Sequence, residues 1–70
     1  MYYFSINDVV LRKCYNIDTN TSFYDVYNKP SNEEELVGDY IGEFTTDYDL
    51  DENEDLFIAE LEDWLLAFNY

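Results

Sequence analysis

Carboxylates are the side chains of this sequence with the greatest capacity for chemistry. The 70 residues include 17 Asp and Glu, three Lys and Arg and no His, for a formal net charge of -14. Paired carboxylates can act as general acid and base, but no nucleophile–base pair or glycine-rich phosphate loop accompanies them. We therefore expect no enzymatic activity, no catalytic residue and no cofactor.

One segment alternates oxygen-bearing side chains in the manner of a calcium loop: Asp47, Asp49, Asp51, Asn53 and Asp55. An EF-hand loop also requires Gly at its sixth position and Glu at its twelfth. Those positions hold Glu52 and Ile58, so the pattern fails twice. We interpret the segment as an acidic loop that leads into a helix, and we predict no metal site. A single cysteine, Cys14, can form neither a disulfide framework nor a zinc site, and we expect it to be buried as a small apolar residue.

The negative charge is concentrated in one half of the chain. Residues 1–29 balance three carboxylates with Arg12, Lys13 and Lys29, whereas residues 30–70 hold 14 carboxylates and no basic residue. A solvated helix face ordinarily mixes charges and gains from Glu–Lys pairs four residues apart, and none occurs after Lys29. Because like charges destabilise a compact state, we infer that function rather than folding selected these carboxylates.

The charge and composition exclude several classes of protein. Binding to bare nucleic acid or to an anionic membrane surface requires Lys and Arg, so we expect neither. The sequence has no run of 18 apolar residues and no basic N-terminal region, from which we expect no membrane span, no secretory signal and a cytoplasmic location. An aromatic content of 20%, with two Gly and one Pro, predicts a folded chain, which we treat as a single acidic domain over residues 1–70.

The pattern of apolar residues predicts an α+β fold, with a small antiparallel sheet of about three strands in the N-terminal half and two helices in the C-terminal half. The predicted strands cover residues 2–6, 9–17 and 22–27, with turns at 7–8 and 18–21. For residues 7–16, a helix capped at Asn7 is an alternative. In the third strand, Tyr24 and Val26 share one face and Tyr27 lies on the other.

Two helices are predicted after Pro30. The first begins at Ser31, which forms a capping-box pattern with Glu34, and ends near Gly42. The second has Asp51 as its N-cap and contains the strongest periodicity of the chain, at Phe57, Leu61, Trp64, Leu65 and Phe68. Because 70 residues enclose a small core, we expect help from a homodimer, and these five apolar residues are the dimer-interface candidates.

Tyrosine is unusually abundant in this sequence. Eight tyrosines exceed what a small core can enclose with every hydroxyl partnered, so several should be exposed, as is common at protein interfaces. The eight are Tyr2, Tyr3, Tyr15, Tyr24, Tyr27, Tyr40, Tyr48 and Tyr70.

The carboxylates of the C-terminal half support a positive hypothesis. Duplex DNA carries one negative charge per about 1.7 Å of axis, and a rigid surface of carboxylates without basic neighbours can imitate it. Such a surface would attract the cationic groove of a DNA-binding protein in a fast, salt-sensitive association. The candidate partner-binding residues are Glu33, Glu34, Glu35, Asp39, Glu43, Asp47, Asp49, Asp51, Glu52, Glu54, Asp55, Glu62 and Asp63.

In size, acidity and scarcity of basic residues, the whole chain resembles the small acidic DNA-mimic inhibitors encoded by bacteriophages, which share charge rather than a diagnostic motif. The resemblance implies an inhibitor that acts in host takeover, in the host bacterial cytoplasm at the nucleoid. It implies a basic host DNA-binding protein as the partner, with the histone-like nucleoid protein HU as the best candidate. Two alternatives stay open. One is an inhibitor that binds the sliding clamp, RNA polymerase or uracil-DNA glycosylase through exposed aromatic residues. The other is a generic acidic domain that requires salt or calcium.

Overall fold

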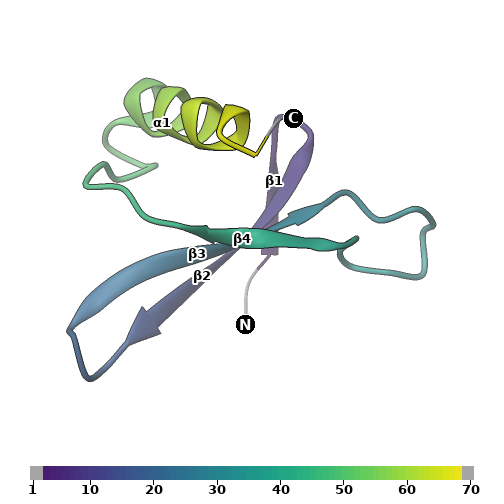
Figure 1. The fold of residues 1–70 in the computed structure, drawn as a ribbon, viewed down its shortest axis with the longest axis horizontal. Helices are drawn as coiled ribbons and strands as arrows, with labels where there is room; N and C mark the ends of the chain where they lie inside the picture. The colour runs from purple at the N-terminus through teal and green to yellow at the C-terminus, as the bar shows by residue number, and fades with distance from the viewer. Residues whose placement is uncertain (1–2, 69–70) are drawn as a thin grey trace.

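The computed structural model describes residues 3–68, which form four strands and one helix. Their order is β1 (Tyr3–Ile6), β2 (Val9–Asn16), β3 (Thr21–Asn28), β4 (Tyr40–Phe44) and α1 (Glu54–Leu66). The strands make one antiparallel sheet in the order β1-β2-β3-β4, and α1 lies across one face of it (Figure 1). The predicted α+β class is confirmed. The sheet has four strands rather than about three, and the described residues form one helix rather than two.

Tight turns connect the first three strands where the sequence predicts them. Residues 7 and 8 join β1 to β2, and residues 17–20 join β2 to β3. Each turn contains an asparagine in the left-handed region, Asn7 at φ 54° and Asn20 at φ 55°, a conformation that asparagine tolerates better than most residues. Residues 9–16 form a strand, so the helical alternative for this stretch is wrong. Tyr2, where the first strand was predicted to begin, lies outside the described residues.

The helix predicted after Ser31 is wrong, because residues 31–39 form turns and bends. The Asn32 side chain shapes this segment: its Oδ1 accepts a hydrogen bond from the Glu34 backbone N–H at 2.9 Å. The apolar residues that suggested the end of this helix instead form β4, which pairs with β3. Pairing satisfies the backbone groups along one edge of β3, a gain that a local apolar pattern cannot reveal.

Gly42, predicted as the end of that helix, is the point where β4 approaches α1 most closely. A Cβ atom added at Gly42 would lie 3.4 Å from Cζ2 of Trp64 and 3.5 Å from Cζ of Phe68. Both distances are ordinary van der Waals contacts, so Gly42 lies directly against the rings of Trp64 and Phe68. Gly42 is a packed strand residue rather than the end of a helix.

The core lies between α1 and the sheet. Leu11, Val26, Phe57 and Leu61 are fully buried, and Phe44 is 1% exposed. Edge-on contacts between aromatic rings join the two layers, with ring centroids 5.2 Å apart for Tyr24 and Phe57 and 5.6 Å apart for Phe44 and Phe57. The same stripe of α1 that the sequence identifies as periodic is thus the side of the helix that covers the sheet.

The helix begins later than predicted. Asn53, rather than Asp51, is the N-cap residue, and its side chain makes no capping hydrogen bond. Asp51 instead lies in a turn in which its backbone N–H donates to Oδ1 of Asp49 at 2.8 Å. Glu54 and Asp55 occupy the first turn of α1, where the helix dipole favours negative charge. No helix within residues 3–68 has the length and hydropathy to cross a membrane.

Candidate partner-binding surface

All 13 predicted partner-binding carboxylates are exposed. Glu60, the remaining carboxylate after residue 30, is exposed as well. The sequence prediction omitted Glu60 because it flanks the apolar stripe of α1 instead of lying opposite it. The whole excess of negative charge is therefore on the surface.

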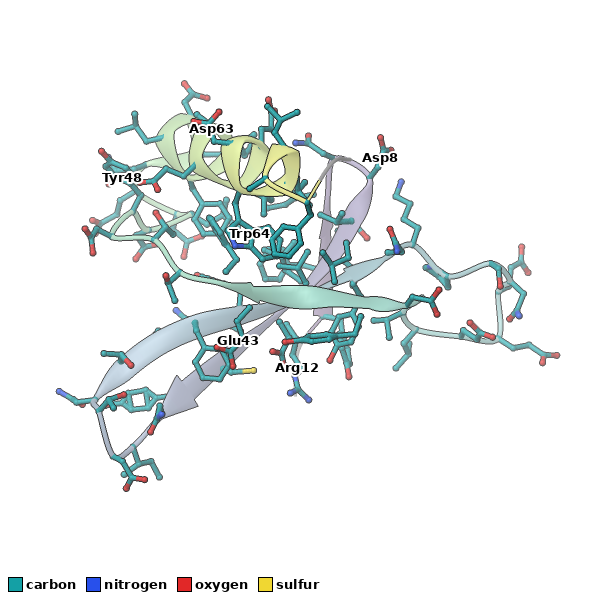
Figure 2. The ribbon with its side chains drawn as sticks, in the orientation of Figure 1. Asp8, Arg12, Glu43, Tyr48, Asp63 and Trp64 are labelled. Carbon is teal, nitrogen blue, oxygen red and sulfur yellow. The ribbon has the colours of Figure 1, made fainter. Side chains whose placement is uncertain are left out.

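The structure divides these carboxylates into three groups rather than one continuous face. Nine lie in the segment that runs from the loop after β4 to the end of α1, and we call this group the acidic helix surface: Asp47, Asp49, Asp51, Glu52, Glu54, Asp55, Glu60, Glu62 and Asp63. Four lie in the β3–β4 loop, which extends from the opposite end of the molecule (Figure 1): Glu33, Glu34, Glu35 and Asp39. Glu43 stands alone, on the side of β4 away from α1 (Figure 2).

Two of the three basic residues, Arg12 and Lys29, form ion pairs in the described part of the chain. Lys13 forms none there, and it lines a small recess together with Asp49 and Asp51. Arg12 pairs with Asp25 at 2.7 Å, and Lys29 lies 3.9 Å from Asp8. Within residues 3–68 these are the only ion pairs, and both use carboxylates from the balanced first 29 residues. The 14 later carboxylates therefore lie without a cationic side chain at salt-bridge distance in the part of the chain that the structure describes.

Backbone hydrogen bonds fold the acidic loop between β4 and α1 into turns. The Asn53 backbone N–H donates to the Asp49 carbonyl at 2.7 Å, and the Tyr48 N–H donates to Oγ1 of Thr46 at 3.2 Å. The spacing of about 6.6 Å expected between alternate residues of an extended strand therefore does not apply to Asp47, Asp49 and Asp51. Nowhere in residues 3–68 do three potential ligands gather in a geometry that would hold a metal ion.

Two negative charges of this loop influence Tyr24, a residue at the edge of the core. Burial raises the pKa of the Tyr24 hydroxyl, and the negative charges of Asp49 and Asp51 raise it further. The phenol therefore stays neutral at physiological pH, and the two carboxylates lie near enough to influence a residue that is 8% exposed.

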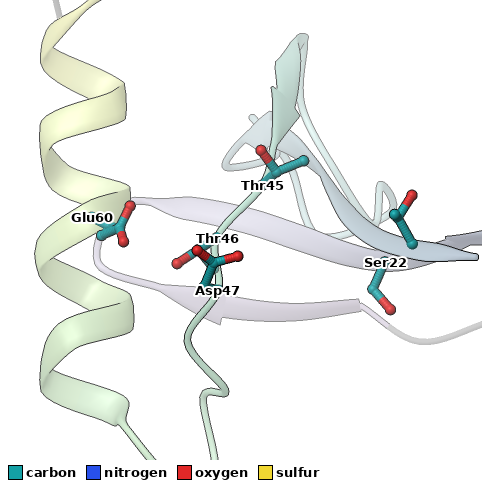
Figure 3. A pocket seen from close by; sticks show the side chains of 6 residues that line it. Ser22, Thr45, Thr46, Asp47 and Glu60 are labelled. Carbon is teal, nitrogen blue, oxygen red and sulfur yellow. The ribbon is translucent and has the colours of Figure 1, made fainter.

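A recess of about 510 Å³ lies where the start of β3, the loop after β4 and the middle of α1 meet (Figure 3). Its lining combines hydroxyls with two carboxylates: Thr21, Ser22, Thr45, Thr46, Asp47 and Glu60. Every one of these groups can accept a hydrogen bond, and two are negatively charged. The chemistry of the recess suits a guanidinium or ammonium group.

A hydrogen bond ties the acidic helix surface to the β1–β2 turn. Nδ2 of Asn7, in the β1–β2 turn, donates to Oε1 of Glu62 at 3.2 Å. This contact joins residues 55 positions apart in the sequence. It helps to hold the C-terminal half of α1 in place over β1 and β2.

The dimer-interface candidates lie mostly inside one chain. Phe57 and Leu61 are fully buried, and Trp64 and Leu65 are half-buried against the same core. Phe68 remains 47% exposed, although its ring contacts that of Trp64 at a centroid distance of 4.6 Å. Phe57 and Leu61 therefore offer no surface to a second copy, and the stripe acts as the core of the monomer.

The face of the sheet that α1 does not cover has a different character. We call it the open face, and strand alternation and register assign to it Tyr3, Val10, Arg12, Cys14, Phe23, Asp25, Tyr27, Tyr40 and Glu43. The ring of Tyr27 contacts Tyr3 at 6.3 Å and Tyr40 at 5.4 Å between centroids. Figure 2 shows Arg12 and Glu43 on this side of the sheet, and Trp64 on the other.

Charged groups of the open face interact closely. The Asp25 carboxylate raises the pKa of the Arg12 guanidinium by accepting its hydrogen bond. Sγ of Cys14 lies 3.5 Å from Oδ2 of Asp25, so Cys14 is half-buried beside an ion pair rather than buried as a small apolar residue. Burial and then the charges of Asp25 and Glu43 raise the pKa of Tyr40.

The prediction that several tyrosines are exposed is confirmed for three of them. Tyr15 is 54% exposed, Tyr40 is 55% exposed and Tyr48 is 36% exposed. Tyr24 is buried and Tyr27 is half-buried, on opposite faces of β3 as predicted. Tyr2 and Tyr70 lie outside the described residues.

Comparison with models of known protein families, with curated proteins and with solved structures finds no match to this chain. The functional argument therefore rests on the chemistry and geometry of these surfaces.

Proposed function

We propose that this protein is a DNA-mimic inhibitor, which occupies the DNA-binding surface of a basic host protein and displaces DNA from it. The observation that carries the proposal is the placement of the 14 C-terminal carboxylates: every one is exposed, and none lies at salt-bridge distance from a described basic side chain. An ordinary acidic surface would neutralise part of its charge with neighbouring Lys or Arg.

The density of charge approaches that of a duplex. The longest dimension of the molecule is 34 Å, so 14 carboxylates give one negative charge per about 2.4 Å of length. Duplex DNA has one per about 1.7 Å of axis. A cationic groove that binds DNA through its phosphates would meet nine of these charges on the acidic helix surface, since the other five lie in the β3–β4 loop and on the far side of β4.

The acidic helix surface is the part of the molecule best suited to make the contact. Its nine carboxylates are carried by a helix that packs on the sheet and by a loop closed with backbone hydrogen bonds. Fixed positions reduce the entropy lost when charged side chains are ordered on binding. The recess lined by Asp47 and Glu60 would receive a basic side chain of the partner, while the surrounding carboxylates provide long-range attraction.

The partner follows from the same chemistry. The partner should be a basic protein that binds DNA mainly through the phosphate backbone. It should also be abundant in the host cell. HU, a histone-like nucleoid protein, fits this description, and the host nucleoid would then be the place of action. Under this proposal the protein has no catalytic role.

The first experiment is an affinity capture from bacterial lysate with the full chain immobilised at low salt. Bound proteins are eluted with duplex DNA and then with high salt, and are identified by mass. We expect one basic DNA-binding protein to elute with DNA, because the two ligands compete for one surface. HU can then be tested directly as a purified protein in competition with labelled duplex DNA.

Matched charge variants test the surface. Asp47→Asn/Glu60→Gln removes two charges from the recess, and Asp8→Asn/Asp18→Asn removes two exposed charges from the balanced half of the chain. We expect the first variant to weaken the captured complex about tenfold and the second less than twofold, since interfacial charge pairs are worth about 0.5–1 kcal/mol each. Equal effects would show that only net charge matters and would remove the recess from the proposal.

The salt elution distinguishes the DNA-mimic proposal from its main alternative, an inhibitor that binds its partner through exposed aromatic residues. A partner that is retained in both DNA and high salt would indicate an aromatic interface, as expected for an inhibitor of the sliding clamp, RNA polymerase or uracil-DNA glycosylase. The exposed rings of Tyr40, Tyr48 and Phe68 would then be the residues to substitute. That result would overturn the DNA-mimic proposal.

A further inference from the structure

We propose that the open face is the contact surface of a homodimer, in which the open faces of two copies pack together across a two-fold axis. This inference concerns self-association and stands independently of the target that the acidic helix surface binds. It moves the dimer interface predicted from the sequence away from α1 and onto the opposite side of the sheet.

The first argument is electrostatic. Two chains that each carry a net charge of -14 repel each other through most of their surfaces. The open face holds one cation and two carboxylates, and Arg12 and Asp25 neutralise each other at 2.7 Å. Glu43 lies on β4, an edge strand, so the two central strands carry no net charge on this face. This is the part of the described surface at which a second copy can approach with least repulsion.

The second argument concerns composition. The open face contains Val10 and the connected rings of Tyr3, Tyr27 and Tyr40. Val10 is 4% exposed although α1 does not cover it. Aromatic residues with a polar hydroxyl and a paired arginine are the residues enriched in interface cores. Tyr40 remains 55% exposed in the single chain and would be covered in the dimer.

The third argument is size. Strands of 4, 8, 8 and 5 residues, spaced about 4.8 Å apart and rising about 3.3 Å per residue, make a face of roughly 400 Å². Two copies would cover roughly 800 Å² in total, which is the size of a weak, reversible interface. A 70-residue domain buries a small fraction of its surface alone, so covering this face adds the apolar burial that the monomer lacks.

A second copy fits this face better than a basic partner does. A two-fold interface requires a patch that is complementary to itself, and an aromatic patch whose two central charges form an ion pair meets this condition. A basic partner would meet a single unpaired carboxylate here, Glu43, whereas the side that carries α1 presents nine. In the dimer the two acidic helix surfaces would lie outward on opposite sides, giving one particle with 28 C-terminal carboxylates.

The test is the mass of the full chain in solution, measured by sedimentation equilibrium over a wide range of concentration and salt. We expect the wild-type mass to be twice the chain mass of 8.4 kDa at high concentration. Added salt should leave the dimer unchanged or tighten it, because it screens the remaining repulsion between the chains. The complex with a basic partner should respond to salt in the opposite direction, so the two associations can be separated.

A matched pair of variants locates the interface. Tyr40→Lys places a cation on the open face, and Tyr15→Lys makes the same change at a strand residue of nearly equal exposure on the other side of the sheet. We expect the dissociation constant of the dimer to rise at least tenfold in Tyr40→Lys and to stay within twofold of wild type in Tyr15→Lys. Circular dichroism checks that both variants keep the native fold.

Three results would overturn the inference. One is a wild-type chain that stays at 8.4 kDa at high concentration and high salt. Another is equal dissociation of both variants, and the third is a host protein whose binding is lost in Tyr40→Lys while the wild type is monomeric. A monomer that still competes with duplex DNA would refute the dimer and leave the proposed function intact.

Discussion

The two faces of the sheet are made from alternate residues of the same strands, yet they are stabilised by different means. On the face beneath α1, Leu11 and Val26 are fully buried by aliphatic and aromatic packing. On the open face, the side chains next to them in sequence include an ion pair and half-buried tyrosines. One side of the sheet is a conventional core, and the other is a mixed surface of the kind found at interfaces.

The difference explains how a chain with such a high charge can fold. The helix contributes its apolar stripe to the core and keeps its carboxylates in solvent. The unfavourable electrostatic free energy of each charge is smallest there, because water has a high dielectric constant. The open face contains Arg12, which neutralises Asp25, the one carboxylate of β3. The carboxylates after residue 30 therefore lie at the surface, and the chain folds around a core and an ion pair that do not involve them.

The largest expected effect lies beneath α1. Phe57→Ala removes a fully buried ring that contacts both Tyr24 and Phe44, and substitutions of this kind cost about 3–5 kcal/mol. Natural domains are stable by only about 5–15 kcal/mol, and a domain of this size lies near the lower end of that range. We therefore expect Phe57→Ala to be largely unfolded at 37 °C. Urea denaturation followed by circular dichroism measures the change. At a protein concentration where the chain is a monomer, Tyr40→Ala, on the open face, is the control and should shift stability by about 0.5 kcal/mol or less. Equal losses would show that the two faces contribute alike.

A smaller effect is expected from the ion pair of the open face. Arg12→Met leaves the Asp25 carboxylate, whose side chain is 13% exposed, without its cation, so we expect a lower urea midpoint. Replacing both partners, in Arg12→Met/Asp25→Leu, removes the unpaired charge and should recover part of the loss. This account would be contradicted if the double variant lost more stability than the two single variants lose together.

The smallest effect concerns alkaline pH. Because burial and the charges of Asp49 and Asp51 raise the pKa of Tyr24 above 10.0, the fold favours the neutral phenol. Its contribution to stability is complete below pH 10.0 and is lost as the pH rises above that value. We expect the urea midpoint of Tyr24→Phe to fall less steeply with pH in this range than that of wild type. Tyr27 and Tyr40, whose pKa values are also raised, are present in both proteins and do not affect the comparison. Parallel curves would refute the assignment to Tyr24.

Most of the β-sheet could be predicted from sequence because its strands are joined by short turns. The alternation of Tyr24, Val26 and Tyr27 and the asparagines of the two turns are local signals, and each corresponds to the element that it predicts. The stripe from Phe57 to Phe68 identified α1 for the same reason. Its N-terminus was predicted two residues too early because Asp51 and Asn53 are equally suitable N-cap residues.

The errors lie where distant parts of the chain decide the outcome. Residues 31–41 have a capping pattern and a short apolar stripe, and they become loop and strand because β3 offers backbone partners for Tyr40–Phe44. Leu36, part of the supposed helix stripe, is left 73% exposed. Phe57 and Leu61 were assigned to a dimer interface because periodicity shows that a stripe is apolar without showing what covers it.

By itself, the sequence determined the quantity of negative charge, its location after residue 30 and the lack of neighbouring cations, because these are properties of composition and order. It also determined the strands and the helix whose partners are close in the chain. Only the tertiary structure decided which side of the sheet α1 covers, that Glu60 joins Asp47 at a recess, and that an aromatic face with a paired Arg12 and Asp25 is left open. These features depend on contacts between residues far apart in sequence, and the free energy of such contacts is not encoded in any local pattern.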